Sequence, residues 1–588
     1  MASDPEALLR LARDEFANGR LARSRELCDE LLGRVPDHPE GLHLLALLEL
    51  SNGNAAAALG PIERALRKDR RDAKKHQTRG LILRAHARRA EAAGAFQEAL
   101  RLSPEFPEAH ASLALTQMEE GEFGEAAREF ERALHLRPDV YPWRLNLGLC
   151  RSHSDDAPGA ADAFQRAVQL NDRLPEGHNN LGTALLATGR LAEAESSFRR
   201  CIALAPQHSH AWTNLGNVLR RSGRPRDAEE AYRRATECQP PVAVAWVNLG
   251  NALKDADRVD EAMACFARAM TISPESPEAH LSRAIACLLA GDLDRGWAEY
   301  RWRFGSPAEP GLRERVEEAI RARRTIEIRG EQGLGDALFF LRWAPLLRGA
   351  GATLAFRGDA RLVPLLERSG VFDRCVGEES ACDGAVDLPS GDLPWVARGI
   401  GTPHPPALPL KASAAHQEAA RGLLEAAGPP PYIGVAWGAG LASGGSAEHL
   451  HKMVPVEALG SALRHVPGTI VSLQRGADAA ELAALSRLVA RPVLDAGDLN
   501  ADLDAILGLL TLLDDYAGVS STNIHMLAGL GRPARILVPA PPEWRYGRAG
   551  SASPWFTGFE LYRQDREREW AGAMKALASD LGRRHGAR

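Results

Sequence analysis

Residues 209–242 read SHAWTNLGNVLRRSGRPRDAEEAYRRATECQPPV, and residues 243–276 read AVAWVNLGNALKDADRVDEAMACFARAMTISPES. The string Trp-x-x-Leu-Gly stands at the same place in both, so that Trp212 and Trp246 are 34 residues apart. Glycines at 148, 182, 216 and 250 keep this spacing, as do prolines at 206, 240 and 274. A fixed period of this length predicts an α-solenoid built from stacked helical hairpins.

The residue types within each unit indicate how the two helices of a hairpin pack. Small residues at the eighth and twentieth positions allow the helices to approach closely, a bulky residue four positions later fills the gap, and proline ends the second helix. An Ala-x-x-x-aromatic pair marks this second helix at Ala126/Phe130, Ala160/Phe164, Ala194/Phe198, Ala228/Tyr232 and Ala262/Phe266. The pattern resembles the tetratricopeptide repeat. Its register predicts about nine units over residues 1–305, beginning near 5, 39, 73, 107, 141, 175, 209, 243 and 277.

Asparagine recurs with the same period at the sixth position of the first helix. The four residues are Asn146, Asn180, Asn214 and Asn248. Asparagine is a mediocre helix former, so four in register require a reason. First helices line the inner surface of such a superhelix, where an amide can pair with the backbone of an extended peptide. We interpret the four as acceptor-protein-binding residues; the alternative is that each bridges neighbouring repeats or faces water.

The composition is that of a globular protein, with 45% hydrophobic and 25% charged residues and a net charge of −5. The absence of long charge runs argues against nucleic-acid and membrane-surface partners. Eight scattered cysteines without a CxxC motif indicate neither disulfides nor a zinc site and favour a reducing compartment. Neither an apolar signal core nor an 18-residue apolar run is present, so we expect a cytoplasmic protein without membrane insertion. The oligomeric state is not indicated.

The repeat pattern ends near residue 305, and residues 306–322 are expected to be a linker. From Thr325 onward, short apolar strands alternate with amphipathic helical stretches, which predicts parallel sheets covered by helices. The strands are expected in TIEIRG, TLAFRG, YIGVAWGAG, TIVSLQRG, RPVLDAG, DYAGVSST and PARILVP. Two such series around a proline-rich joint predict two Rossmann-like halves, at 323–430 and 431–588. Ligands of these sheets bind beyond the carboxyl ends of the strands.

One candidate loop follows the first of these strands. Gly333 and Gly335 permit a tight turn and a close backbone approach, and a helix amino terminus favours an anion. The loop lacks the Lys-Ser/Thr of a P-loop. Asp336 is interpreted either as the cap of the next helix or as a general base that faces the cleft.

A second candidate loop joins a strand to a helix at 518–525. Ser520, Ser521, Thr522 and Asn523 are small hydrogen-bonding groups suited either to phosphate oxygens or to ordinary helix capping. His525 would lie one turn inside the helix, where a core histidine is common. Lys452, and Gln474 with Arg475 in SLQRG, are expected near the same edge, where the two cations would neutralise a diphosphate or simply be solvated.

Two further motifs bear on the chemistry. The segments 543–546 and 554–556 are rich in aromatic residues, which would stack on a base or sugar or close the core between the halves. Asp502-Leu503-Asp504 matches an Asp-x-Asp metal signature but falls in a helical segment. The histidines lack acidic or cysteine partners at ligand spacing, so no metal and no cofactor are predicted.

Five ordered segments over roughly 325–575 resemble bacterial family-nine glycosyltransferases of the heptosyltransferase type, in particular those fused to tetratricopeptide repeats. They are GEQGLGDALFFLRWAPLLRGAGA, YIGVAWGAG, TIVSLQRGA, HMLAGLGRPARILVP and PEWRY…SPWF. The resemblance implies a two-lobed GT-B fold, a metal-independent inverting reaction and Asp336 as the base. The first half would hold the acceptor and the second the nucleotide sugar. One departure is that Ser520 and Ser521 stand where the family usually has Asp-Thr.

These expectations combine into one function: transfer of a sugar from a nucleotide sugar to a Ser/Thr hydroxyl of a protein held by the repeats. In layout the chain resembles the eukaryotic O-linked N-acetylglucosamine transferase, and similar repeat-fused bacterial enzymes glycosylate flagellin. Two alternatives stay open. In the first, the chain is a catalytically inactive repeat scaffold or chaperone. In the second, it is a glycosyltransferase that acts on lipid or polysaccharide.

Overall fold

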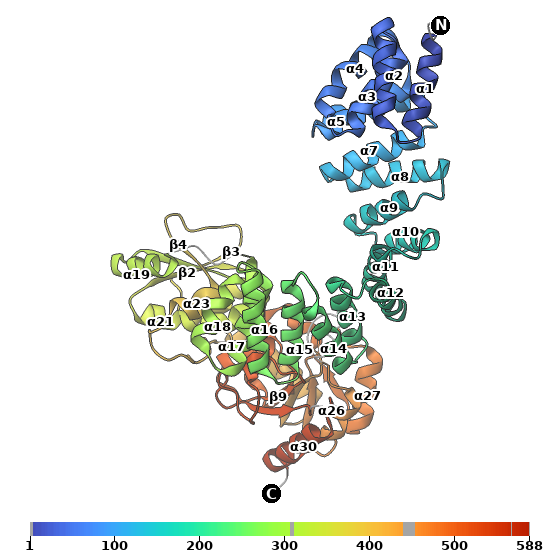
Figure 1. Ribbon diagram of the computed structural model, residues 1–588. Coiled ribbons are helices and arrows are strands. Elements are labelled where there is room, and N and C mark those ends of the chain that lie inside the picture. Colours follow the sequence, from blue (N-terminus) through green and yellow to red (C-terminus); the bar gives the residue numbers. More distant parts are fainter. Residues whose placement is uncertain (1–3, 306–310, 439–452, 566, 587–588) are drawn as a thin grey trace. The chain divides into compact units, whose positions relative to one another are not determined.

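The computed structural model describes residues 4–305, 311–438, 453–565 and 567–586 (Figure 1). The chain forms two compact units, Met1–Gln239 and Pro240–Arg588. The compact units thus divide inside the predicted repeat array, and the predicted end of the repeats at residue 305 stays a prediction.

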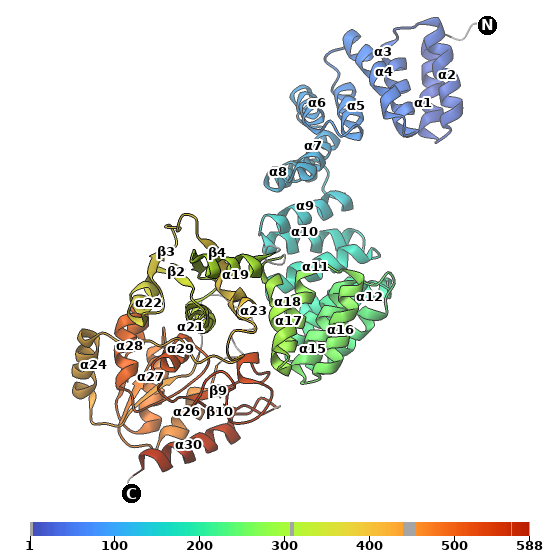
Figure 2. The same ribbon diagram turned by 90° about the vertical axis from the view of Figure 1, so that its left-hand side faces the viewer.

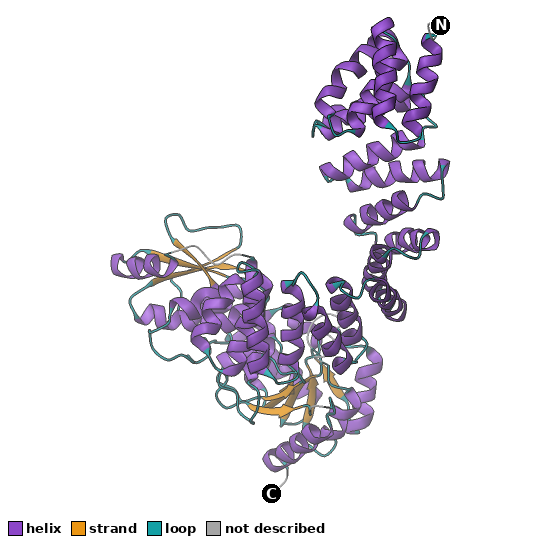
Figure 3. Ribbon diagram, in the orientation of Figure 1, coloured by secondary structure: helices purple, strands orange, loops and turns teal. Residues whose placement is uncertain are grey.

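In its described residues the first unit consists of helical hairpins (Figures 1 and 3). The first helices of the hairpins begin at residues 5, 39, 73, 107, 141, 175 and 209, where the 34-residue register places them. The bounds are α1 (Pro5–Ala17), α2 (Leu21–Arg34), α3 (Pro39–Ser51), α4 (Ala55–Lys68), α5 (Ala73–Ala85), α6 (Arg89–Leu102), α7 (Pro107–Glu120), α8 (Phe123–Leu136), α9 (Tyr141–His153), α10 (Ala157–Leu170), α11 (Pro175–Ala187), α12 (Leu191–Leu204), α13 (Ser209–Arg221) and α14 (Pro225–Glu237).

The glycine at the eighth position of a repeat is where the two helices of a hairpin touch. A Cβ atom added to Gly182 would lie 2.6 Å from the ring of Phe198, and one added to Gly216 would lie 2.4 Å from the ring of Tyr232. The aromatic ring thus occupies the space that a side chain at the eighth position would need. The predicted close approach is confirmed, and the ring that fills the gap belongs to the residue four after the alanine.

A second periodic contact was not predicted from the sequence. In several repeats the side chain at the fourth position makes a hydrogen bond to the carbonyl oxygen six residues earlier, in the loop between repeats, whereas Trp246 Nε1 has no partner among the described residues. Arg144 Nε donates to Pro138 at 2.9 Å and Trp212 Nε1 to Pro206 at 2.9 Å, and His110 and His178 contact their carbonyls through Nε2. Arginine, tryptophan and histidine share an N–H donor, which explains why such different residues occupy one position.

The second unit begins with the last two helical hairpins and continues into the α/β region. Its helices are α15 (Ala243–Asp255), α16 (Val259–Ile272), α17 (Pro277–Ala290), α18 (Leu293–Tyr300), η1 (Arg301–Phe304), α19 (Leu312–Ala322), α20 (Leu334–Phe340), η2 (Leu341–Trp343), α21 (Ala344–Gly349), η3 (Ala360–Leu362), α22 (Val363–Ser369), η4 (Ser390–Asp392), α23 (Leu393–Val396), α24 (Ala414–Ala427), α26 (Val456–Leu463), α27 (Ala479–Val489), η5 (Gly497–Ala501), α28 (Leu503–Leu512), α29 (Thr522–Gly529), η6 (Trp544–Tyr546) and α30 (Ala571–His585).

In the described residues the strands form two sheets, and every named strand pair is parallel (Figure 3). The first sheet has the order β3-β2-β1-β4 and the second the order β10-β9-β8-β5-β6-β7. The bounds are β1 (Thr325–Arg329), β2 (Thr353–Gly358), β3 (Arg374–Gly377), β4 (Val386–Pro389), β5 (Tyr432–Ala436), β6 (Thr469–Ser472), β7 (Val493–Asp495), β8 (Asp515–Gly518), β9 (Arg535–Val538) and β10 (Glu560–Arg563). The expected parallel sheets with covering helices are confirmed.

Three details differ from the sequence interpretation. The strands β3, β4 and β10 were not anticipated. The helical segment after β1 is not continuous but is divided into α20, η2 and α21, because Pro345, in the first turn of α21, lacks the N–H that would continue one helix. Helix α24, which a boundary at 430/431 assigns to the first half, packs against α28 of the second sheet (Figure 2). A Cβ atom on Gly508 would lie 2.7 Å from the backbone oxygen of His416, so this contact is close.

Candidate functional site

The strand order of each sheet reverses between two neighbouring strands. In the first sheet the reversal lies between β1 and β4, and in the second it lies between β5 and β8. Crevices beyond the carboxyl ends of strands at such points are the usual ligand sites of parallel sheets. The relevant loops are therefore 330–333 after β1 and 519–521 after β8. The loop after β5 continues into residues 439–452, outside the described residues.

The glycine-rich loop after β1 brings the first sheet against the second. Helix α20 contacts α29, and a Cβ atom on Gly335 would lie 3.2 Å from the His525 ring and 3.6 Å from the Cα atom of Thr522. Gly335 therefore permits this close approach. Gly333 is the N-cap of α20 with extended backbone, and the left-handed residue of the turn is Gln332, at φ 61°. The turn uses a non-glycine residue where the sequence suggested glycine.

Asp336 lies in the first turn of α20 with 34% of its side chain exposed. It is not the cap of this helix, because Gly333 holds that position. Its carboxylate forms an ion pair with Arg545, which lies in η6 after the last-but-one strand of the second sheet. A charged group of the second sheet thus faces the carboxylate that was predicted as a candidate base.

Arg545 is the residue around which the site is organised, and it was not predicted from the sequence. Its side chain is 11% exposed and lies 3.5 Å from Glu543 and within 4.8 Å of the ring centre of Phe339. Burial alone would lower the pKa of Arg545, but the neighbouring carboxylates of Asp336 and Glu543 raise it. The guanidinium is therefore charged.

The loop after β8 is held by its own neighbours. Ser520 donates to Glu543 at 3.2 Å and accepts a hydrogen bond from the Tyr546 hydroxyl at 2.9 Å. Ser521 is the N-cap of α29, but its side chain makes no capping hydrogen bond, so the capping alternative is not realised there. The first backbone N–H groups of α29 therefore have no side-chain cap and are available to an anion, which the helix dipole also attracts.

Thr522 is half-buried, whereas Asn523 and His525 are buried. Burial, together with the positive charges of Arg545 and Arg342, lowers the pKa of His525 well below its ordinary value. The imidazole is therefore neutral at physiological pH. Its Nδ1 atom is buried and has no hydrogen-bond partner among the described residues.

Of the remaining predicted nucleotide-binding residues, Gln474 and Arg475 follow β6 in the described part of the chain. The Gln474 side-chain oxygen accepts hydrogen bonds from the backbone N–H groups of Trp437 and Gly438, so this residue shapes the loop that follows β5. Arg475 is exposed at the end of β6. Lys452 lies outside the described residues.

The aromatic segments form a core and do not line an open surface. Trp544, Trp555 and Phe556 are buried, and Trp544 packs edge-on against Phe339 and Trp297 at ring distances of 5.2 and 5.4 Å. Of the two alternatives predicted for these segments, the structure realises the second, which was closure of the core. Trp297 comes from the last helical hairpin, so this hairpin is part of the same core.

The last hairpin also holds the glycine-rich loop by polar contacts. The amide of Gln332 donates to the Tyr300 hydroxyl at 3.1 Å. Arg303 donates to Glu331 at 2.6 Å, and both side chains are about 4% exposed. These residues were not predicted from the sequence, because the repeat pattern ends at 305 and does not indicate what its final helix contacts.

The four periodic asparagines are half-buried on first helices α9, α11, α13 and α15. First helices of adjacent hairpins contact one another, as α11 and α13 do. Asn214 donates to Asn179 at 3.4 Å, which is a bridge of the kind that the alternative interpretation described. Among the described residues, the Asn146 and Asn248 side chains have no hydrogen bond to another group.

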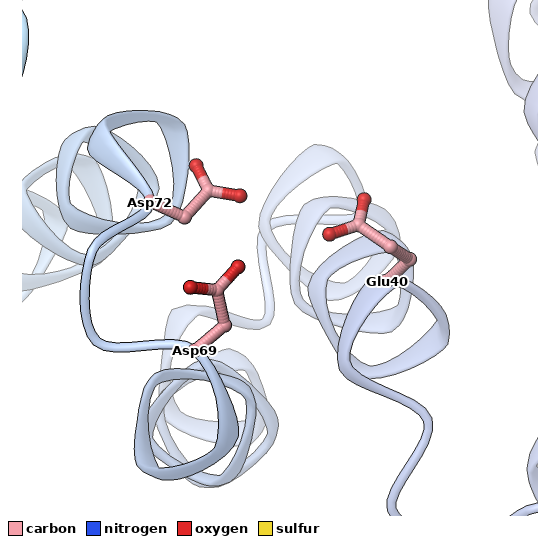
Figure 4. A group of neighbouring side chains, drawn as sticks. All are labelled: Glu40, Asp69 and Asp72. Carbon is pink, nitrogen blue, oxygen red and sulfur yellow. The ribbon is translucent and has the colours of Figure 1, made fainter.

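Two clusters of acidic residues are neutralised or hydrogen-bonded by neighbouring protein groups. Glu40, Asp69 and Asp72 converge in the first unit (Figure 4). The fully buried Lys75 Nζ lies 2.5 Å from Glu40 and 3.0 Å from Asp69, so an ammonium neutralises this cluster. In the Asp-x-Asp segment, Asp502 caps α28 and Asp504 pairs with Arg368.

Two cavities of the second unit are formed by its described residues, and neither is lined by Asp336 or by residues 520–525. One, of about 540 Å³, lies beside β4. The other, of about 120 Å³, lies between α18 and the segment 394–403. No described helix has the length and apolar character needed to cross a membrane.

Comparison with known proteins supports the repeats. Family models of the tetratricopeptide repeat match residues 9–73, 78–127, 112–175, 173–240 and 243–276. Among curated proteins, Protein FlbA of Caulobacter vibrioides is 28% identical over 347 residues, which cover 53% of this chain and 56% of that protein. The chain thus spans about half the length of this curated relative.

Solved tetratricopeptide structures align with parts of the chain. YrrB, described as a TPR protein with an unusual peptide-binding site, is 24% identical and covers 31% of this chain and 95% of its own, with a TM-score of 0.30. A tetratricopeptide repeat protein from Parabacteroides merdae is 16% identical. The alignment covers 42% of this chain and 98% of that protein, with a TM-score of 0.33. The sequence family models establish that the helical hairpins between residues 9 and 276 are tetratricopeptide repeats.

Proposed function

We propose that the chain is a glycosyltransferase that moves a sugar from a nucleotide-sugar donor to a Ser or Thr hydroxyl of a protein held by the repeats. The strand order β10-β9-β8-β5-β6-β7 supports a nucleotide-binding lobe, because it is the order 3-2-1-4-5-6 of doubly wound dinucleotide-binding sheets, read from the opposite edge. A second parallel sheet beside it is consistent with a two-lobed GT-B enzyme.

One observation carries the proposal. The glycine-rich loop of one sheet meets the loop after β8 of the other where Gly335 lies against Thr522 and His525. This junction places a carboxylate, Asp336, near an uncapped helix amino terminus that begins at Thr522. A base and an anion-binding helix end, contributed by two lobes, are the parts that an inverting transfer from a nucleotide sugar needs.

The proposed reaction uses these groups in a direct displacement. The Asp336 carboxylate accepts the proton of the acceptor hydroxyl while its oxygen attacks the anomeric carbon of the sugar. The bond to the nucleotide diphosphate breaks, and the negative charge of the leaving group is stabilised by the α29 N–H groups and by the charged Arg545. The donor must therefore draw Arg545 away from Asp336. No metal enters this scheme.

The acceptor in this proposal is an extended protein segment that lies along the first helices of the repeats. The half-buried amides of Asn146, Asn180, Asn214 and Asn248 are the groups that would bind its backbone. The resemblance to repeat-fused bacterial transferases makes flagellin one candidate acceptor.

A second candidate function is a repeat scaffold whose sheets no longer catalyse transfer. Three observations favour it: Asp336 is already paired with Arg545, Ser520 is bonded to Glu543 and Tyr546, and neither the cavity beside β4 nor the one beside α18 contains these residues.

Calorimetry with nucleoside diphosphates distinguishes the two candidates. A transferase binds at least one of them with a measurable Kd, and the binding weakens in an Arg545→Gln variant because the leaving-group phosphates lose a charged donor. Arg321→Gln, on the exposed side of α19, is the matched control with unchanged binding. Absence of binding by every diphosphate contradicts the transferase and supports the scaffold.

A further inference from the structure

The last helical hairpin, formed by α17 and α18 with η1 at its end, contacts both sides of the candidate site. Its first helix, α17, packs against η6, which carries Arg545. Its end contacts the glycine-rich loop, which leads into α20 and Asp336. The same hairpin thus touches the segments that contribute both members of the Asp336–Arg545 ion pair.

Tyr300 contacts the residue at which the glycine-rich loop turns. The amide nitrogen of Gln332 donates to the Tyr300 hydroxyl at 3.1 Å, and the hydroxyl lies 3.3 Å from the oxygen of the same amide. Gln332 has a φ of 61°, a left-handed conformation that is unfavourable for a residue with a side chain. A contact that stabilises this conformation therefore fixes the turn and the direction in which α20 begins. The Tyr300 ring is buried and packs against Phe340 of α20 at 5.7 Å.

Arg303 holds the preceding residue of the loop. Its guanidinium donates through Nε and Nη2 to Glu331 Oε2, at 3.2 and 2.6 Å, and through Nη1 to Asp392 Oδ1 at 2.6 Å. The backbone N–H of Gly391 donates to the same Glu331 oxygen at 3.2 Å. A Cβ atom on Gly391 would lie 2.7 Å from Arg303 Nε, so the guanidinium fits closely between the loop and η4.

This arrangement requires an arginine, because one planar guanidinium presents N–H groups to two carboxylates at once. Both carboxylates are buried, and a buried carboxylate that loses its cation is strongly destabilising. The loop therefore stays where Arg303 can reach Glu331. Its position depends on a residue at the end of the helical hairpins as well as on strand β1.

We propose that Tyr300 and Arg303 are positioning residues, which act on sugar transfer through the glycine-rich loop and thereby through Asp336. They hold the loop so that the Asp336 carboxylate faces the second sheet. Neither residue contacts the donor or the acceptor in this proposal. The effect on sugar transfer rests on the proposed transferase function, whereas the effect on the loop does not.

Hydrogen exchange of the full chain, followed by mass spectrometry, tests the effect on the loop without any ligand. Tyr300→Phe keeps the ring and loses only the hydroxyl, so the amides of 330–340 are expected to exchange about 3- to 10-fold faster than in the wild type. Arg303→Lys keeps the buried charge but not the fork, and its effect is expected to be at least as large. Arg398→Gln, which breaks an exposed ion pair with Asp294 of α18, is the control with unchanged exchange. Unchanged exchange in both Tyr300→Phe and Arg303→Lys overturns the proposal.

The kinetics of sugar transfer separate positioning from a general loss of structure. With labelled nucleotide sugar and lysate protein, the maximal rate of Tyr300→Phe is expected to fall about 3- to 10-fold. The apparent KM for the nucleotide sugar is expected not to rise, because the phosphates are held by the second sheet and not by the loop. A raised KM with an unchanged maximal rate contradicts the positioning role.

A double variant shows whether Tyr300 acts through Asp336. The base is absent from Asp336→Asn, so adding Tyr300→Phe is expected to leave the residual rate unchanged. A further fall by the factor seen in the single variant would show that Tyr300 acts independently of Asp336, and would overturn the proposal. If the wild type binds no nucleoside diphosphate and transfers no sugar, the transferase proposal fails. Faster exchange of the loop in Tyr300→Phe and Arg303→Lys would still show that these residues hold it.

Discussion

At the scale of single residues, the central feature of the candidate site is the ion pair between Asp336 and Arg545. The carboxylate comes from the first sheet and the guanidinium from the second, 209 positions later in the sequence. Sequence reasoning could select Asp336 because it follows a glycine-rich loop after a strand. It could not select Arg545, because nothing in the local sequence of η6 indicates which carboxylate it will meet. Such pairing is a property of the tertiary fold.

Asp336→Asn keeps the shape of the side chain but removes its capacity to accept a proton. We expect the rate of sugar transfer to fall by about 10² to 10⁴-fold, since general bases contribute factors of that size. Binding of nucleoside diphosphate, measured by calorimetry, is expected to be retained or to tighten, because the change releases Arg545 from its ion pair and leaves it available to the phosphates. Asp227→Asn, on an exposed helix surface, is the control. Transfer at the normal rate by Asp336→Asn would remove this residue from the mechanism.

His525 provides a pH-dependent prediction. Its folded-state pKa lies well below the ordinary value of 6.5, so below pH 6.5 the unfolded chain binds a proton that the folded chain does not. The free energy of unfolding therefore decreases as pH falls below 6.5, with a contribution of about 1.4 kcal/mol lost by pH 5.5. Urea titrations should show this loss in the wild type and a shallower decrease in His525→Gln. An NMR titration that shows the His525 ring protonating near pH 6.5 would contradict the burial argument.

At the scale of elements, the sequence predicted the repeats far better than the sheets. A 34-residue period repeats the same packing contact, so every glycine and aromatic residue in register adds evidence for one structure. The strands β3, β4 and β10 are four residues long and carry no such repetition. They pair as parallel strands with β2, β1 and β9, and this pairing is what makes them strands. Short, partly exposed edge strands have little local signal.

Glycines in two different hairpins, Gly182 in α11 and Gly94 in α6, provide a matched test of repeat packing. Gly182→Ala would bring a Cβ atom to 2.6 Å from the Phe198 ring, and we expect a loss of about 1–3 kcal/mol in the free energy of unfolding. Gly94→Ala, inside α6 with nothing within 4 Å of the added atom, should instead stabilise by up to about 1 kcal/mol, because alanine favours a helix. Denaturant unfolding followed by circular dichroism measures both. Equal effects of the two changes would show that the ring contact does not limit the eighth position.

At the scale of the whole molecule, the last two repeats belong to the same compact unit as the two sheets. Trp297 and Tyr300, from the final helix of the array, contact Trp544 and Gln332 at the junction. The sequence indicated two parts and the kind of structure in each. It did not indicate that the end of the repeats supports the glycine-rich loop, because that contact depends on how the elements pack.

The periodic asparagines are tested on the full chain. Replacing Asn180, Asn214 and Asn248 together by alanine is expected to weaken binding of the acceptor protein at least about tenfold. Each lost hydrogen bond to the acceptor backbone contributes about 0.5–1.5 kcal/mol. Nucleotide binding should not change, because these residues lie on repeat helices. Asn52→Ala, at the exposed end of α3, is the control. Normal modification of the acceptor by the triple variant would show that the asparagines only bridge repeats.

The most direct test of the account is transfer itself. The purified chain is incubated with labelled nucleotide sugars and a cell lysate from a strain that lacks it, and protein, lipid and polysaccharide fractions are counted and analysed by mass spectrometry. The account predicts label on Ser or Thr residues of a protein, dependent on Asp336. Label only in lipid or polysaccharide, or in no fraction with any nucleotide sugar, would contradict a transferase that acts on a protein held by the repeats.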